Sequence, residues 1–144
     1  MSATAFSLYN RAKFKIGHGD IVLGTAVLKL KLHTSASNAS TFTLSTFASI
    51  NNAIAATGNY PANGRSLLSM VWNTGASAKS YKLDAADIVL TASASALTNV
   101  KFATIGISAG LALCWSRLST AQFTVTVPNT LTIQFNTLGI LTLA

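Results

Sequence analysis

Residues 27–33 alternate strictly between apolar and basic side chains. Within VLKLKLH every second residue is a leucine, and the residues between are Lys29, Lys31 and His33. A period of two is typical of a β-strand with one face in a hydrophobic core. The pattern predicts a strand that buries its leucines. Its basic face would suit a polynucleotide, an acidic protein surface or water.

Two segments near the C-terminus repeat this alternation. Residues 123–127 read FTVTV, and residues 131–135 read LTIQF. Pro128 and Asn129 lie between them, and this pair suits the centre of a tight turn. We therefore predict a hairpin from these two strands, followed by a closing strand at 139–144.

Further short strands are expected between clusters of Gly, Asn, Asp and Ser, at 20–24, 26–34, 65–73, 79–83, 87–91, 98–107 and 110–115. Such spacing is typical of a sandwich or barrel. One segment predicts a helix instead, because Leu44, Phe47, Ile50 and Ile54 recur every three or four residues. The expected fold is all-β, an antiparallel β-sandwich or jelly-roll-like barrel with one short helix near residues 44–55.

The length favours a single domain. A chain of 144 residues can bury roughly two-thirds of its unfolded surface in one core. Cys114 is the single cysteine, so no intrachain disulfide can form. We found no linker and no internal repeat. We interpret residues 1–12 as an N-terminal arm and residues 13–144 as a single β-rich domain.

The composition points to an assembly. Ala, Thr and Ser number 23, 18 and 16, whereas charged residues make 9% of the chain against a usual ~25%. Small side chains pack against neighbours at little cost in side-chain entropy. A solitary protein normally carries more surface charge for solubility. The chain is therefore expected to function within a larger structure.

The charge that is present is strongly basic. Ten Lys and Arg residues face three acids, which gives a net charge of +7 and predicts attraction to a negative partner. Half of these cations fall within residues 11–31. We predict that a partner, either another protein or a neighbouring subunit, contacts Arg11, Lys13, Lys15, Lys29, Lys31 and His33.

The residues that could carry chemistry do not form a recognisable site. Asp84 and Asp87 are the one adjacent pair of acids, and they more naturally accept backbone N–H bonds in a turn than catalyse hydrolysis. His18 and Asp20 could supply two metal ligands, but zinc needs three or four. Cys114 lies in an apolar strand, where an inert thiol is expected. We expect no catalytic residue, metal or cofactor, and so no enzyme.

Nucleic acid and membrane are weaker candidates as partners. An oligonucleotide-binding barrel would show several exposed aromatic residues for base stacking, whereas residues 27–33 contain none. The N-terminus lacks the apolar core of a secretory signal. The longest apolar stretch, 105–115, is too short to span a bilayer. A nucleic-acid-binding β-barrel remains the alternative from another functional class.

Several ordered stretches of the chain resemble a recurrent family of small virion proteins of tailed bacteriophages and prophages. The resemblance extends from about residue 12 to the C-terminus and rests on KFKIGHGDIVLGTAVLKLKLHTSASNAS, TLSTFASINNAI, GNYPANGRSL, KLDAADIVLTAS and NTLTIQFNTLGILTLA. Family members carry an acid where this chain has Asn51 and Asn52, and an aromatic-rich strand where it has KFATIGI. These departures make an acid-dependent contact at that place doubtful.

The resemblance implies a non-enzymatic structural protein of the virion, assembled in the cytoplasm of a bacterial host. Our first expectation is a capsid decoration, or cement, protein that bridges capsomers by binding the major capsid protein. Such proteins cluster around symmetry axes, so a homo-trimer or another homo-oligomer is expected. The alternative within the virion is a component of the tail, the neck or a fibre base.

Overall fold

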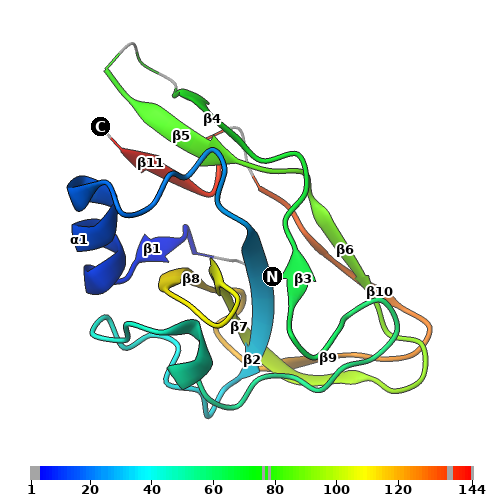
Figure 1. The fold of residues 1–144 in the computed structure, drawn as a ribbon. Coiled ribbons are helices and arrows are strands. Elements are labelled where there is room, and N and C mark those ends of the chain that lie inside the picture. Colours follow the sequence, from blue (N-terminus) through cyan, green and yellow to red (C-terminus); the bar gives the residue numbers. More distant parts are fainter. Residues whose placement is uncertain (1–3, 76, 78, 136–137, 144) are drawn as a thin grey trace.

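A computed structural model describes residues 4–75, 77, 79–135 and 138–143 (Figure 1). The elements are β1 (Ser7–Leu8), α1 (Asn10–His18), β2 (Leu28–Thr34), the 3-10 helix η1 (Phe47–Ser49), β3 (Arg65–Ser66), β4 (Val71–Thr74), β5 (Tyr81–Asp84), β6 (Ile88–Thr91), β7 (Leu97–Ile107), β8 (Ala112–Arg117), β9 (Phe123–Val125), β10 (Thr130–Ile133) and β11 (Leu141–Leu143). All strand pairings in this part of the chain are antiparallel. The predicted all-β class with one short helix is confirmed.

The largest sheet is built around β7. Its strand order is β1, β8, β7, β2 and β3, and β9 pairs with another part of β7. The β2–β7 ladder is the longest pairing and runs from Leu28 opposite Ile107 to Thr34 opposite Val100. Strands joined in this way satisfy their backbone N–H and C=O groups while projecting alternate side chains to opposite faces.

The leucine face of β2 lies in the core, as predicted. Leu28, Leu30 and Leu32 are at most 1% exposed, and they share one hydrophobic cluster with Leu83 and Leu90. Burying one such side chain contributes about 1.5–3 kcal/mol to folding. Alternation therefore identified the inward face of β2 correctly.

Two smaller sheets supply the other layer of this core. One contains β11, β5 and β4, and the other pairs β10 with β6. Only residues 85–87 separate β5 from β6, and Figure 1 shows the two sheets end to end along one side of the main sheet. Their inward residues are buried, and Leu83, Leu90 and Ile133 among them are at most 5% exposed.

The opposite face of the main sheet is covered by residues 35–57, here called the covering segment. Phe47 of this segment lies directly on Gly106 of β7, where an added Cβ would come within 2.6 Å of the Phe47 ring. The Lys31 ammonium lies 4.9 Å from the centre of the same ring. The basic face of β2 is thus turned toward protein along part of its length.

His33 corrects the prediction of an exposed basic face. The side chain is fully buried. Its Nδ1 lies 3.0 Å from the Asn51 carbonyl oxygen, and its Nε2 lies 2.8 Å from the Thr104 hydroxyl. Because a carbonyl can only accept, Nδ1 carries the proton and Nε2 accepts from the hydroxyl. A neutral histidine therefore ties the covering segment to the sheet, and it is not available to a partner.

The predicted helix at 44–55 is also corrected. This stretch contains only the three-residue η1, and its flanking residues Thr46 and Ile50 are extended. Phe47 N–H bonds to Gly110 O, and Ile54 N–H bonds to Leu32 O. The β7–β8 turn and β2 thus supply backbone partners that a helix would have supplied internally. Its Thr, Ser and Asn residues favour helix weakly, so the tertiary contacts prevail.

The α-helix lies instead at Asn10–His18, and the predicted arm boundary at residue 12 falls inside it. The sequence NRAKFKIGH holds several strong helix formers. Gly19 ends the helix with a left-handed φ of 84°, a conformation that suits glycine. Thr4 and Tyr9 bond through their backbone N–H groups to β8. The described part of the predicted arm is therefore packed on its own chain, and residues 1–3 lie outside the described residues.

The predicted C-terminal hairpin is wrong, although its turn forms. Asn129 N–H bonds to Thr126 O at 2.7 Å. However, β9 pairs with β7, and β10 pairs with β6. The turn is a corner at which the chain passes from the main sheet to a smaller one.

The closing strand is confirmed as β11, and residue 144 lies outside the described residues. Residues 20–24, predicted as a strand, form a loop.

The outer edge of β2 is closed by side-chain and loop contacts. The two-residue β3 pairs only with Lys29 and Leu30. Beyond β3, the Leu32 N–H donates to the Tyr60 hydroxyl at 2.9 Å, and the Leu32 carbonyl accepts from Ile54. Burial raises the pKa of Tyr60 to about 12. The phenol therefore remains neutral and satisfies a backbone donor that no strand reaches.

Acid is expected to destabilise the fold through His33. Burial lowers the pKa of His33 from 6.5 to about 4. Between these two pKa values the unfolded chain binds a proton that the folded chain does not. The free energy of unfolding therefore falls as the pH drops from about 6.5 to about 4, by about 3 kcal/mol in total. Urea unfolding at about pH 7 and about pH 4 measures the loss.

His33→Gln should show a smaller loss between the two pH values than the native chain. His18→Gln is the matched control, because it removes the other histidine, exposed on α1, and leaves the buried contacts of His33 in place. It should retain the large loss that the burial of His33 produces. An undiminished pH dependence in His33→Gln would contradict the assignment.

Gly106→Ala is expected to destabilise the protein by about 1–3 kcal/mol, because the new methyl group overpacks against Phe47 and the Leu111 carbonyl. Gly17→Ala is the control, since nothing lies within 4 Å of that position and alanine favours helix. Urea unfolding midpoints measure both. Equal stability of Gly106→Ala and the native chain would show that Phe47 does not rest on the strand.

Candidate partner-binding surface

Three of the predicted partner-binding residues lie together on α1. Arg11 and Lys13 are exposed, and Lys15 is half-buried. The Arg11 guanidinium lies 5.4 Å from the centre of the Phe14 ring, and this ring is 56% exposed. The helix therefore presents cations and an aromatic ring at the surface.

Asp20 compensates one of these charges. Its carboxylate pairs with the Lys15 ammonium and with His18 Nδ1. The hydrogen bond from Lys15, followed by that from His18, lowers the pKa of Asp20 below its usual value. His18 and Asp20 thus close the C-terminal turn of α1. Arg11 and Lys13 make no ion pair with a described carboxylate.

The remaining predicted residues are not part of this group. Lys29 and Lys31 are half-buried on β2, and β7 separates β2 from β8, the strand that α1 contacts. Lys31 lies against Phe47, and His33 is buried. Of the six predicted residues, the structure brings together the three on α1 and assigns the β2 residues to a covered face.

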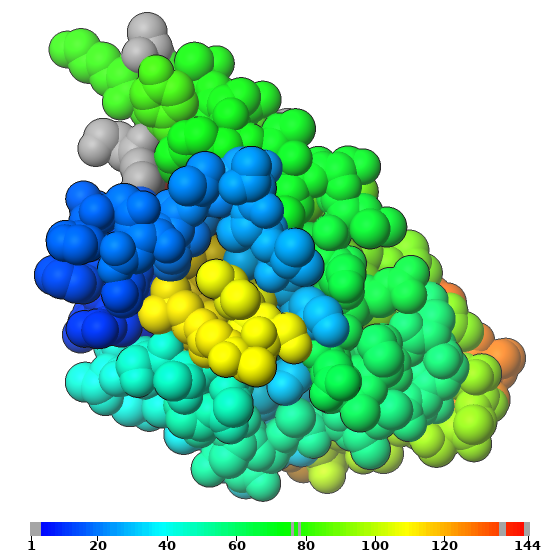
Figure 2. Space-filling model, in the orientation of Figure 1, coloured from blue at the N-terminus to red at the C-terminus, as the bar shows by residue number. Residues whose placement is uncertain are grey.

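Sequence reasoning missed a groove beside α1. It is an open hollow of about 660 Å³ between α1, the α1–β2 connection and β4. Val22 and Val71 line it and are 64% and 46% exposed. In Figure 2 the blue surface of α1 and its connection borders the green surface of the chain near residue 70. We call Arg11, Lys13, Val22 and Val71 the α1 surface.

A signal for this groove was present in the sequence. Ile21, Val22 and Leu23 are consecutive apolar residues. Neighbouring residues of an extended chain point in opposite directions, so such a run leaves an apolar side chain outside unless both sides are covered. Leu23 is buried, Ile21 is half-buried and Val22 is exposed.

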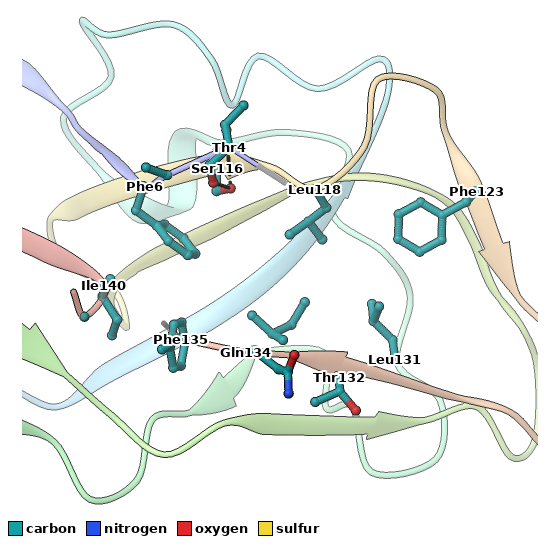
Figure 3. A pocket seen from close by; sticks show the side chains of 13 residues that line it. Thr4, Phe6, Ser116, Leu118, Phe123, Leu131, Thr132, Gln134, Phe135 and Ile140 are labelled. Atoms are coloured by element: carbon teal, nitrogen blue, oxygen red, sulfur yellow. Dashed lines mark hydrogen bonds between the residues drawn. The ribbon is translucent and has the colours of Figure 1, made fainter. Parts of the chain in front are cut away.

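A second hollow, of about 390 Å³, lies where the N-terminal segment, the end of β8 and the β10 region meet (Figure 3). The Phe6 and Phe135 rings lie 6.1 Å apart at one end of it. The Ser116 hydroxyl on its wall already donates to the Thr4 carbonyl at 2.7 Å. No titratable side chain lines this hollow, so its walls offer apolar contacts and hydroxyls.

The candidate chemical residues occupy structural positions. Asp84 pairs with Lys82 and accepts from the Ala85 N–H, and Asp87 accepts from the Phe135 N–H. The expected role of these acids as acceptors of backbone N–H bonds is confirmed. Cys114 is buried, and burial raises its pKa. Among the described residues, no three His, Cys, Asp or Glu side chains gather as metal ligands.

Within the described ranges, no helix is long and apolar enough to cross a membrane. The chain matches no protein-family model, no curated protein and no solved structure. The function must therefore be argued from the geometry of the α1 surface and from the composition of the chain.

Proposed function

We propose that this chain is a structural protein of a tailed-bacteriophage virion, and that it decorates the capsid by binding the major capsid protein across neighbouring capsomers. This proposal rests on the residues of the α1 surface. Its two cations lack a described carboxylate partner, and its two valines are exposed. Such a surface complements a partner that is both acidic and apolar.

On α1, Lys13 is the cation that lies next to the groove. Ile16 lines the groove and lies three residues after Lys13 on α1, a spacing that makes helix residues neighbours. Apolar burial would supply affinity, and the positive charge would steer a negatively charged lattice toward the groove. The low proportion of charged residues and the many small side chains support close packing of many copies.

Modest affinity per contact is sufficient for decoration. A copy held by one capsid subunit meets the next subunit intramolecularly, and this multiplies the apparent affinity without new contacts. Self-association around a symmetry axis, for example as a trimer, would add further contacts. The resemblance of residues 12–144 to phage virion proteins supports the same assignment. The proposal includes no catalytic step.

The first test is copy number. A decoration protein is expected to approach the abundance of the major capsid protein when purified particles are separated on a denaturing gel and quantified by staining. This follows because each copy serves only the few capsid subunits around it. An abundance of a few copies per particle would reject decoration and favour the tail, the neck or a fibre base.

The second test reverses a charge on α1. Lys13→Glu is expected to weaken binding to particles lacking the protein by at least about tenfold at low salt, because the replacement repels an acidic partner. Co-sedimentation with such particles measures the bound fraction.

Lys79→Glu is the matched control, since Lys79 is exposed on the β4–β5 connection and the replacement changes the net charge equally. Equal weakening by both variants would show that only net charge matters. Unchanged binding of Lys13→Glu would remove α1 from the contact.

A further inference from the structure

An aromatic hollow lies on the covered side of the main sheet, away from the α1 groove. It has a volume of about 420 Å³ and is lined by Phe42, Phe102 and Trp115, together with Lys101 and Arg117. The Trp115 ring lies edge-on to the other two, with centroids 5.7 Å from Phe42 and 6.2 Å from Phe102. Phe42 is 45% exposed, so part of the cluster faces solvent.

Two cations of the hollow lack a carboxylate partner. The Lys101 ammonium lies 5.8 Å from the centre of the Phe102 ring, and Arg117 is exposed. The chain has only three acids. Asp20 pairs on α1, Asp84 pairs with Lys82, and Asp87 accepts a backbone N–H. Neither Lys101 nor Arg117 therefore meets an acidic side chain of its own chain.

The indole of Trp115 provides an independent observation. Its Nε1 is buried and has no hydrogen-bond acceptor. A buried N–H without an acceptor is uncommon in folded proteins. Trp115 also lines the hollow, so a ligand that contacts its ring would change the surroundings of this N–H.

We propose that this hollow binds a carboxylate-bearing segment of a partner protein. The carboxylate would pair with Lys101 and Arg117, and an apolar neighbour would contact Phe42. The open shape and the small volume suit one or two side chains. This site goes beyond the α1 surface, and its test requires no virion particle.

Protein is favoured over nucleic acid because the ring faces are poorly placed for stacking. Single-stranded nucleic acid uses several exposed aromatic faces in succession. Here Phe102 is 8% exposed, Lys101 lies near its ring, and Trp115 stands between two other rings. Phe42 is the one ring of this cluster with a large exposed area.

The test uses the full chain and a blocked six-residue peptide that alternates glutamate with leucine. The indole N–H signals in the NMR spectrum report binding, with Trp72→Phe used to assign the Trp115 signal. The glutamate peptide is expected to shift the Trp115 signal, and a glutamine–leucine peptide of the same length is not. Arg117→Ala should weaken binding by about fivefold, the loss expected for one exposed ion pair.

Lys79→Ala removes one positive charge elsewhere and should leave peptide binding unchanged. An unshifted Trp115 signal, or equal shifts with the glutamine peptide, would overturn the proposal. So would tighter binding of a ten-residue oligothymidylate than of the glutamate peptide, because that result would assign the hollow to nucleic acid. None of these outcomes bears on Lys13 and particle binding, so the two proposals can fail separately.

Discussion

The pairing of β2 with β7 is the interaction on which the other layers depend. It places Leu30 opposite Ile105 and Lys31 opposite Thr104, so one face of the ladder is apolar and the other is mixed. A slip of one residue would turn the leucines of β2 toward the covering segment. The same slip would change which β2 residue lies beside Gly106, the position that leaves room for Phe47. Core and cover therefore require the same register.

The alternation of apolar and polar residues was sufficient to predict which face of a strand is buried. The leucines of β2, and Leu131 and Ile133 of β10, are buried as their alternation indicated. Pairing partners could not be obtained in this way. The turn at Pro128 and Asn129 was recognisable, but β9 and β10 pair with β7 and β6, strands that lie far back along the chain. Neighbours that are distant in sequence decide where such strands go.

In the candidate sites, too, some residues could be assigned from the sequence and others only from the folded chain. Arg11 and Lys13 could be identified from charge alone, and they lie at the surface. His33 and Lys31 could not be assigned, because alternation shows which face a residue occupies and does not reveal what covers that face. The cluster of Phe42 with Trp115 joins residues far apart in the sequence. Only the folded chain brings these two rings within 5.7 Å of each other.

The Tyr60 hydroxyl has a consequence for how copies can meet. An exposed strand edge is a template onto which another chain can add, and long uncovered edges promote aggregation. On β2 the phenol occupies the Leu32 N–H, while Ile54 occupies the Leu32 carbonyl. Strand-to-strand polymerisation along this edge would first have to displace both. At high protein concentration, this closure directs any association toward side-chain surfaces, whose chemistry can select one partner.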